Sequence, residues 1–165
     1  SELAVAVNLS VDNLHDTHFR RYTELTLKVA GGPEQLIMEV SSRALERDPD
    51  PPIPMLELMR AKGIRVTLDD ASEDDAHVLE KFPVDIVKVS RTLIMRMGRD
   101  YRALDYVRAV VSASRGRGIE TTAVGVEDEA TWDRLAELGF SGAQGFLIAA
   151  PMPAQQLIEW RAARV

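Results

Sequence analysis

Short apolar runs alternate along the chain with longer segments in which apolar residues recur every three or four positions. The runs are rich in valine, isoleucine, leucine and alanine, and they are too short to be amphipathic helices. We interpret them as strands that are buried on both faces. The predicted strands end at Asn8 or cover residues 36–40, 64–68, 84–89, 121–126 and 142–148.

The segments between the strands have the apolar spacing and the end signals of helices. Pro54 is suited to the first position of a helix, Ser72 and Asp75 resemble a capping pair, and several segments stop at glycine. The predicted helices cover residues 16–29, 54–63, 72–81, 100–115, 127–139 and a last segment that Pro153 opens.

Alternation of buried strands with helices is typical of a parallel sheet that helices cover, so the fold class is α/β. In such folds the functional groups lie at the carboxyl ends of the strands. The periodicity leaves open whether the sheet closes into a barrel.

Composition limits the possible partners and the chemistry. The 165 residues suit one domain, and the net charge of −6 argues against a nucleic-acid or membrane surface, because both partners are polyanionic. The absence of cysteine excludes disulfides and thiolate catalysis. Without a long apolar run or a leader pattern, we expect a cytoplasmic protein or a cytoplasmic piece of a larger protein.

Polar residues follow the predicted strands. Asn8, Glu39, Asp69 and Asp70 form an all-oxygen set suited to a hard divalent cation, and Lys88 stands at the end of another strand. Lys88 would either relieve repulsion between the carboxylates or orient a metal-bound water. The alternative is that these residues are helix caps and solvated loop residues.

The segments VNLS, MEV, LDD, VKV, VGVE and QGF, in this order and spacing, resemble the EAL domain, the cyclic di-GMP phosphodiesterase of bacterial signalling. The resemblance covers nearly the whole chain. It implies an incomplete or modified TIM-type barrel of about six βα units, where a closed barrel has eight. On this interpretation residues 1–165 are a single degenerate domain that lacks the first two strands of the family fold.

The resemblance also assigns roles to residues. It implies metal ligands, with Mg²⁺ or Mn²⁺ as the ion, at Asn8, Glu39, Asp69 and Asp70. It implies catalytic positions at Lys88 and Glu127, and a substrate-binding position at Gln144. Each of these residues stands at the matching position of a family motif in the sequence.

Several positions depart from the family pattern. Val124 replaces the first glutamate of the AEGVE motif, Ser90 replaces the aspartate of KID, and Ser42 replaces the second glutamate of ExxE. The glutamate–alanine–leucine signature is absent, and the loop after Asp70 has lost its glycines. We therefore expect a catalytically inactive regulatory or protein-interaction module in cyclic di-GMP-related signalling, in which metal binding is weak or absent.

Two other enzyme interpretations remain. The first is an active metal-dependent phosphodiesterase completed by sequence outside the chain. The second is a barrel enzyme that uses Lys88 as a Schiff-base amine, which the neighbouring acids disfavour because they stabilise a positive charge on Lys88.

The expected partners follow from the incomplete barrel. Strand edges at residues 3–7 and 142–148 would be open, and open edges invite pairing, so we expect a homodimer or another protein partner. Cyclic di-GMP binding is expected to be weak or lost. His15, His18 and His77 have no metal-binding spacing, and the two tryptophans are expected to be packing or interface groups.

Overall fold

The structure is a computed structural model that describes residues 3–26, 32–48, 50–72 and 78–163. Its centre is a sheet of six strands in the order β1-β2-β3-β4-β5-β6, and every neighbouring pair is parallel. The strands are β1 (Val5–Asn8), β2 (Leu36–Ser41), β3 (Arg65–Ala71), β4 (Ile86–Val89), β5 (Glu120–Val124) and β6 (Gly142–Gln144).

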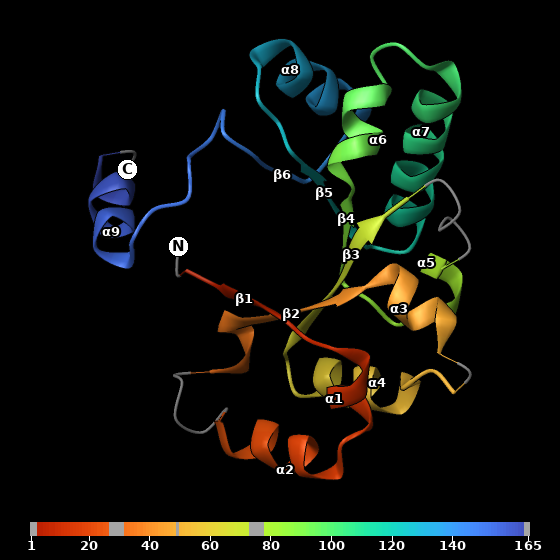
Figure 1. Cartoon of the computed structure of the whole chain (residues 1–165), viewed down its shortest axis with the longest axis vertical. Helices are drawn as coiled ribbons and strands as arrows, with labels where there is room; N and C mark the ends of the chain where they lie inside the picture. Colours follow the sequence, from red (N-terminus) through yellow and green to blue (C-terminus); the bar gives the residue numbers. More distant parts are fainter. Residues whose placement is uncertain (1–2, 27–31, 49, 73–77, 164–165) are drawn as a thin grey trace.

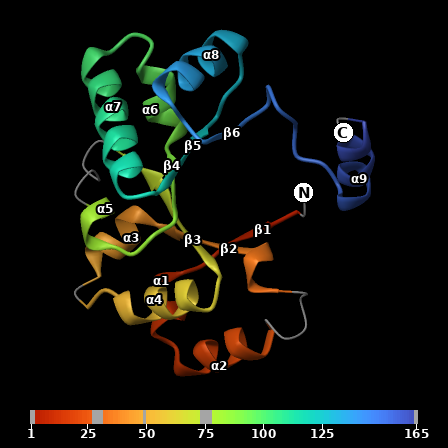
Figure 2. The ribbon, with the colours of Figure 1, turned by 180° about the vertical axis from the view of Figure 1, so that it is seen from behind.

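The sheet curls into an open half-barrel, and helices cover its outer side (Figure 1). The view from behind shows the same curl, with α9 apart from the other helices and on the same side as the start of β1 (Figure 2). The helices are α1 (Val11–His15), α2 (Thr17–Thr26), α3 (Ser42–Arg47), α4 (Ile53–Ala61), α5 (Val78–Lys81), α6 (Arg91–Arg96), α7 (Tyr101–Gly116), α8 (Glu129–Leu138) and α9 (Ala154–Ala162), with a 3-10 turn, η1 (Pro33–Gln35), before β2.

The core lies between the middle strands and the helices that follow them. Val40, Val66 and Val87 are fully buried, as is Leu56 of α4. The faces of these strands that the helices cover are apolar, and Glu39, Thr67 and Lys88 alternate with the buried residues on the opposite face. By contrast, all four residues of β1 are exposed. The predicted class, a parallel α/β half-barrel of six βα units, is confirmed.

Three short helices begin directly at the strand ends, and the sequence prediction missed them. Serine caps each one: the side chains of Ser10, Ser41 and Ser90 accept hydrogen bonds from the backbone N–H groups of Asn13, Ala44 and Leu93. Such short helices have too few turns for apolar periodicity to reveal them. They place helix N-termini along the edge of the sheet where the functional residues are expected.

The last strand is shorter than predicted. β6 ends at Gln144, not at residue 148, and β5 ends at Val124. Gly145, directly after β6, lies against the backbone of Val126, which follows β5. This approach requires glycine, because a Cβ atom at position 145 would lie 2.1 Å from the carbonyl oxygen of Val126. Gly125 leaves β5 with a φ of 81°, which favours glycine.

Other helix predictions hold with shifted ends. α4 begins at Ile53, one residue before Pro54. α2 is described as far as Thr26, and the rest of its predicted range, to residue 29, lies outside the described residues. The expected capping pair at Ser72, the acidic run that follows it and His77 lie wholly or partly outside the described residues, which resume at α5.

A histidine–carboxylate contact joins the end of α1 to the segment after α3. His15 Nε2 lies 2.6 Å from Asp48 Oδ2. This hydrogen bond to Asp48 raises the pKa of His15, and the same bond lowers the pKa of Asp48. The ion pair therefore exists in the pH range between the two shifted values.

This contact predicts a pH-dependent contribution to stability. The contribution of His15 is fully present below its unfolded pKa of about 6.5 and is lost as pH rises through the raised folded value. Comparing the unfolding free energies of wild type and His15→Gln from about pH 5 to about pH 9 tests this. The difference is expected to shrink with rising pH, and a constant difference contradicts the assignment.

Candidate functional site

Parallel pairing brings the polar strand ends to one edge of the sheet. In the register of the strands, Asn8 pairs with Glu39, and Ser41 pairs with Asp69. On the other side of the sheet centre, Val124 pairs with Gln144. The residues predicted from the sequence thus share one edge, but the side chains divide into separate groups.

The first group is an ion-pair cluster of Lys88, Glu39 and Asp69. Lys88 Nζ donates to both carboxylate oxygens of Glu39 at 3.0 Å and lies 3.6 Å from Asp69 Oδ1. The side chains of Lys88 and Glu39 are 12% and 13% exposed, and that of Asp69 is 32% exposed. Three neighbouring strands, β2, β3 and β4, are therefore linked by one half-buried ammonium group.

Asp70 is directed away from that cluster. Successive residues of a strand point to opposite faces, and Asp70 also adopts a left-handed φ of 57° next to a register shift in β3. It lines a separate pocket of about 250 Å³ together with Arg43 and Ser90. Ser42 Oγ donates to the backbone oxygen of Asp70 at 3.4 Å, which supports this conformation.

The predicted metal ligands are therefore not gathered around one point. Glu39 and Asp69 meet at Lys88, Asn8 is adjacent to Glu39 only through strand pairing, and Asp70 lies apart. Across residues 3–26, 32–48, 50–72 and 78–163, no three carboxylate or imidazole side chains converge to hold a metal ion. The oxygen donors suit a hard cation, but a divalent ion at Glu39 would have to displace the ammonium group of Lys88.

The second group surrounds Glu127. Its carboxylate lies 2.6 Å from the guanidinium group of Arg91, which directly follows the cap residue of α6. The Arg91 side chain crosses Gly125 so closely that a Cβ atom there would lie 2.3 Å from Arg91 Cγ. The sequence prediction missed Arg91. It could have been found as a basic residue after β4, because the acidic segment before α8 follows the neighbouring strand β5.

Gln144 contributes its backbone to the join between β5 and β6. Its carbonyl oxygen accepts hydrogen bonds from the N–H groups of Gly125 and Val126 at 2.7 and 3.1 Å. Its neighbour in the register, Val124, is half-buried and apolar. Valine can neither accept a proton nor bind a metal ion at this strand end.

The burial of the cluster predicts that removing one of its charges destabilises the fold more than removing two opposite charges together. Lys88→Met leaves the Glu39 carboxylate half-buried without a counter-charge and is expected to cost about 3 kcal/mol in urea unfolding. Removing both charges in Lys88→Met/Glu39→Gln is expected to restore most of that loss.

A matched control is the exposed ion pair of Arg65 and Glu120, whose charged atoms are 2.7 Å apart. Arg65→Gln is expected to cost less than about 1 kcal/mol, because solvent screens exposed pairs. Equal losses from Lys88→Met and Arg65→Gln would show that burial of the cluster has no energetic consequence.

The chain matches proteins of cyclic di-GMP signalling. A family model described as EAL domain matches residues 1–151. The bifunctional diguanylate cyclase/cyclic di-GMP phosphodiesterase MucR of Pseudomonas aeruginosa is 32% identical in an alignment that covers 93% of this chain. The chain spans 23% of the length of MucR.

Two solved structures have the same fold. The PaMucR phosphodiesterase in complex with cyclic di-GMP superposes with a TM-score of 0.82 at 31% identity, covering 93% of this chain and 64% of that one. The manganese and cyclic di-GMP complex of Klebsiella pneumoniae BlrP1 has a TM-score of 0.81 at 27% identity, covering 90% of this chain and 39% of that one. These matches confirm the resemblance that the strand-end motifs indicated.

Proposed function

The chain belongs to the EAL domain family, and we propose that it is a catalytically inactive member that serves as a regulatory or protein-interaction module in cyclic di-GMP-related signalling. The observation that carries this proposal is the engagement of Glu39. Both of its carboxylate oxygens accept hydrogen bonds from Lys88 at 3.0 Å. A residue that resemblance assigns to metal binding is thereby part of an internal ion pair.

The departures from the family pattern support the same proposal. Val124 occupies the position of a family glutamate and supplies no oxygen. Ser90 and Ser42 replace carboxylates, and each has a local structural role: Ser90 caps α6, and Ser42 donates to Asp70. Because losing one transition-state donor costs about a hundred- to a thousandfold in rate, the combined losses leave negligible turnover.

Turnover of cyclic di-GMP by this chain with Mg²⁺ or Mn²⁺ tests the proposal. We expect no linear dinucleotide product above the background given by Asp69→Ala, because Val124, Ser90 and Ser42 replace carboxylates of the family pattern. Chromatography of the products measures this directly. Wild-type turnover that Asp69→Ala abolishes would overturn the proposal.

The second candidate is an active cyclic di-GMP phosphodiesterase that sequence outside these residues completes. It is favoured by the 31% identity to the PaMucR phosphodiesterase, of which the chain covers 64%. Calorimetry with cyclic di-GMP in Mg²⁺ or Mn²⁺ separates the candidates further. Tight, metal-dependent binding favours the phosphodiesterase, and weak or absent binding favours the interaction module.

We infer a homodimer from the open edges of the sheet. Among the described strands, β1 and β6 each pair on one side only. Val5 and Val7 of β1 are 59% and 43% exposed, so the edge next to Glu39 offers unpaired backbone groups and apolar side chains.

Of the helices that the structure describes, none has the length and apolarity needed to cross a membrane.

Sedimentation equilibrium tests the dimer. Wild type is expected to dimerise, and Val5→Lys is expected to weaken association because a charge on the edge strand opposes pairing. Met95→Lys, at an exposed residue of α6, is the matched control and is expected to leave association unchanged. A monomer at high concentration, or equal effects of both variants, contradicts edge pairing.

A further inference from the structure

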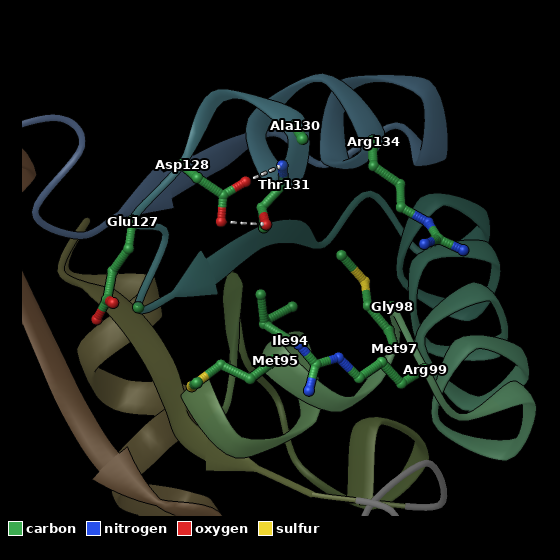
Figure 3. A pocket seen from close by; sticks show the side chains of 11 residues that line it. Ile94, Met95, Met97, Gly98, Arg99, Glu127, Asp128, Ala130, Thr131 and Arg134 are labelled. Carbon is green, nitrogen blue, oxygen red and sulfur yellow. Dashed lines mark hydrogen bonds between the residues drawn. The ribbon is translucent and has the colours of Figure 1, made fainter.

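A pocket of about 420 Å³ lies between α6 and α8, next to the carboxyl end of β5 (Figure 3). Its volume is in the range of small-molecule sites in proteins. It is distinct from the Lys88 cluster, since none of Lys88, Glu39 and Asp69 lines it. The end of α6, the turn before α7 and the first turns of α8 form its walls.

The two carboxylates of the pocket already have partners. Glu127 is paired with Arg91 at 2.6 Å. Asp128 caps α8, and its oxygens accept hydrogen bonds from the backbone N–H and the hydroxyl group of Thr131 at 2.7 and 3.0 Å (Figure 3). The charge of Glu127 is matched by Arg91, whereas Asp128 has only neutral donors and keeps its negative charge at the start of α8.

The two arginines of the pocket lack such partners. No hydrogen bond or ion pair connects the side chain of Arg99 or Arg134 with another residue in the part of the chain that the structure describes. Arg99 extends across the pocket from the turn before α7, and Arg134 projects from α8 on the other side (Figure 3). The pocket thus has free guanidinium donors on a protein whose net charge is −6.

The floor of the pocket is apolar. Ile94 and Met97 are 2% and 3% exposed and belong to the core, while their neighbour Met95 is 58% exposed at the rim. Methionine side chains adapt to ligands of different shape because they are flexible and polarizable. An occupant therefore needs an apolar portion for this floor and an anionic group for the arginines.

We propose that this pocket binds a small organic anion, an apolar body that carries one carboxylate or phosphate group. The anionic oxygens accept hydrogen bonds from the guanidinium group of Arg99 or from that of Arg134 on the other side of the pocket, since the planar guanidinium group pairs with either oxyanion through two parallel bonds. The apolar body packs mainly on the exposed side chain of Met95, above the nearly covered Ile94 and Met97. Because Gly125 also lines the pocket, the occupant contacts the chain one residue beyond Val124.

Nuclear magnetic resonance with two probes tests the site. Octanoate and octyl phosphate are titrated separately into the ¹⁵N-labelled chain, with octanol as the neutral counterpart of equal length. We expect saturable shifts of the Gly98 and Gly125 amide signals with at least one of the anions, and weaker effects of octanol. The two anions distinguish a carboxylate from a phosphate ligand.

Three variants make the outcome decisive. Arg99→Gln/Arg134→Gln is expected to weaken anion binding at least about tenfold, the usual effect of losing charged hydrogen bonds. Arg102→Gln removes an exposed arginine of α7 outside the pocket and is expected to change nothing. Ala130→Trp keeps the charges but fills the space at an exposed position of α8, and is expected to abolish binding.

Unchanged thermal unfolding confirms that each variant is folded. Equal affinity of wild type and the double arginine variant, shifts confined to β1, or no saturable shift with either anion would overturn the proposal. These outcomes are independent of cyclic di-GMP turnover, so the pocket and the proposed function can fail separately.

Discussion

The ammonium group of Lys88 between Glu39 and Asp69 is the interaction on which the arrangement of the strand ends depends. Parallel pairing of β2, β3 and β4 brings these side chains to one edge of the sheet. The two carboxylates lie 3.0 and 3.6 Å from the same ammonium nitrogen, so without a positive charge between them they would repel each other. A cation is therefore needed, and the chain supplies one from β4.

The strand pattern predicted the fold because the helix-covered face of each middle strand is fully buried. Val66, Leu68, Val87 and Val89 have no exposed surface, so valine or leucine recurs at every second position of these runs. The predicted end of β6 was wrong because it depends on a contact between residues that are distant in the sequence. Gly145 lies against the backbone of Val126. Single-turn helices after the strands were missed because capping serines also occur in loops.

The candidate site was predictable as a set of residues but not as a geometry. Parallel strands place Glu39, Asp69 and Lys88 at the same edge, which the sequence indicates. The sequence does not indicate that Lys88 engages both oxygens of Glu39 while Asp70 turns to another pocket. Those details depend on the register shift in β3 and on side-chain packing. Arg91 and the pocket next to α8 depend likewise on how α6 and α8 approach each other.

The family to which the domain belongs and the contacts that its strand-end residues now make are separate matters. Membership of the EAL family explains why polar residues end the strands. Their present contacts are structural: Ser90 caps a helix, Arg91 pairs with Glu127, and Lys88 neutralises Glu39. The open strand edges and the pocket between α6 and α8 are the surfaces to which we assign binding. Such surfaces are what we expect of the regulatory or protein-interaction module proposed above.

Anomalous diffraction from crystals soaked in MnCl₂ tests the central claim most directly, because it locates the metal and Lys88 in the same experiment. The account predicts no manganese peak between Glu39 and Asp69, with Lys88 Nζ still within hydrogen-bonding distance of both Glu39 oxygens. A manganese peak at that position, with the Lys88 side chain withdrawn from Glu39, would contradict it.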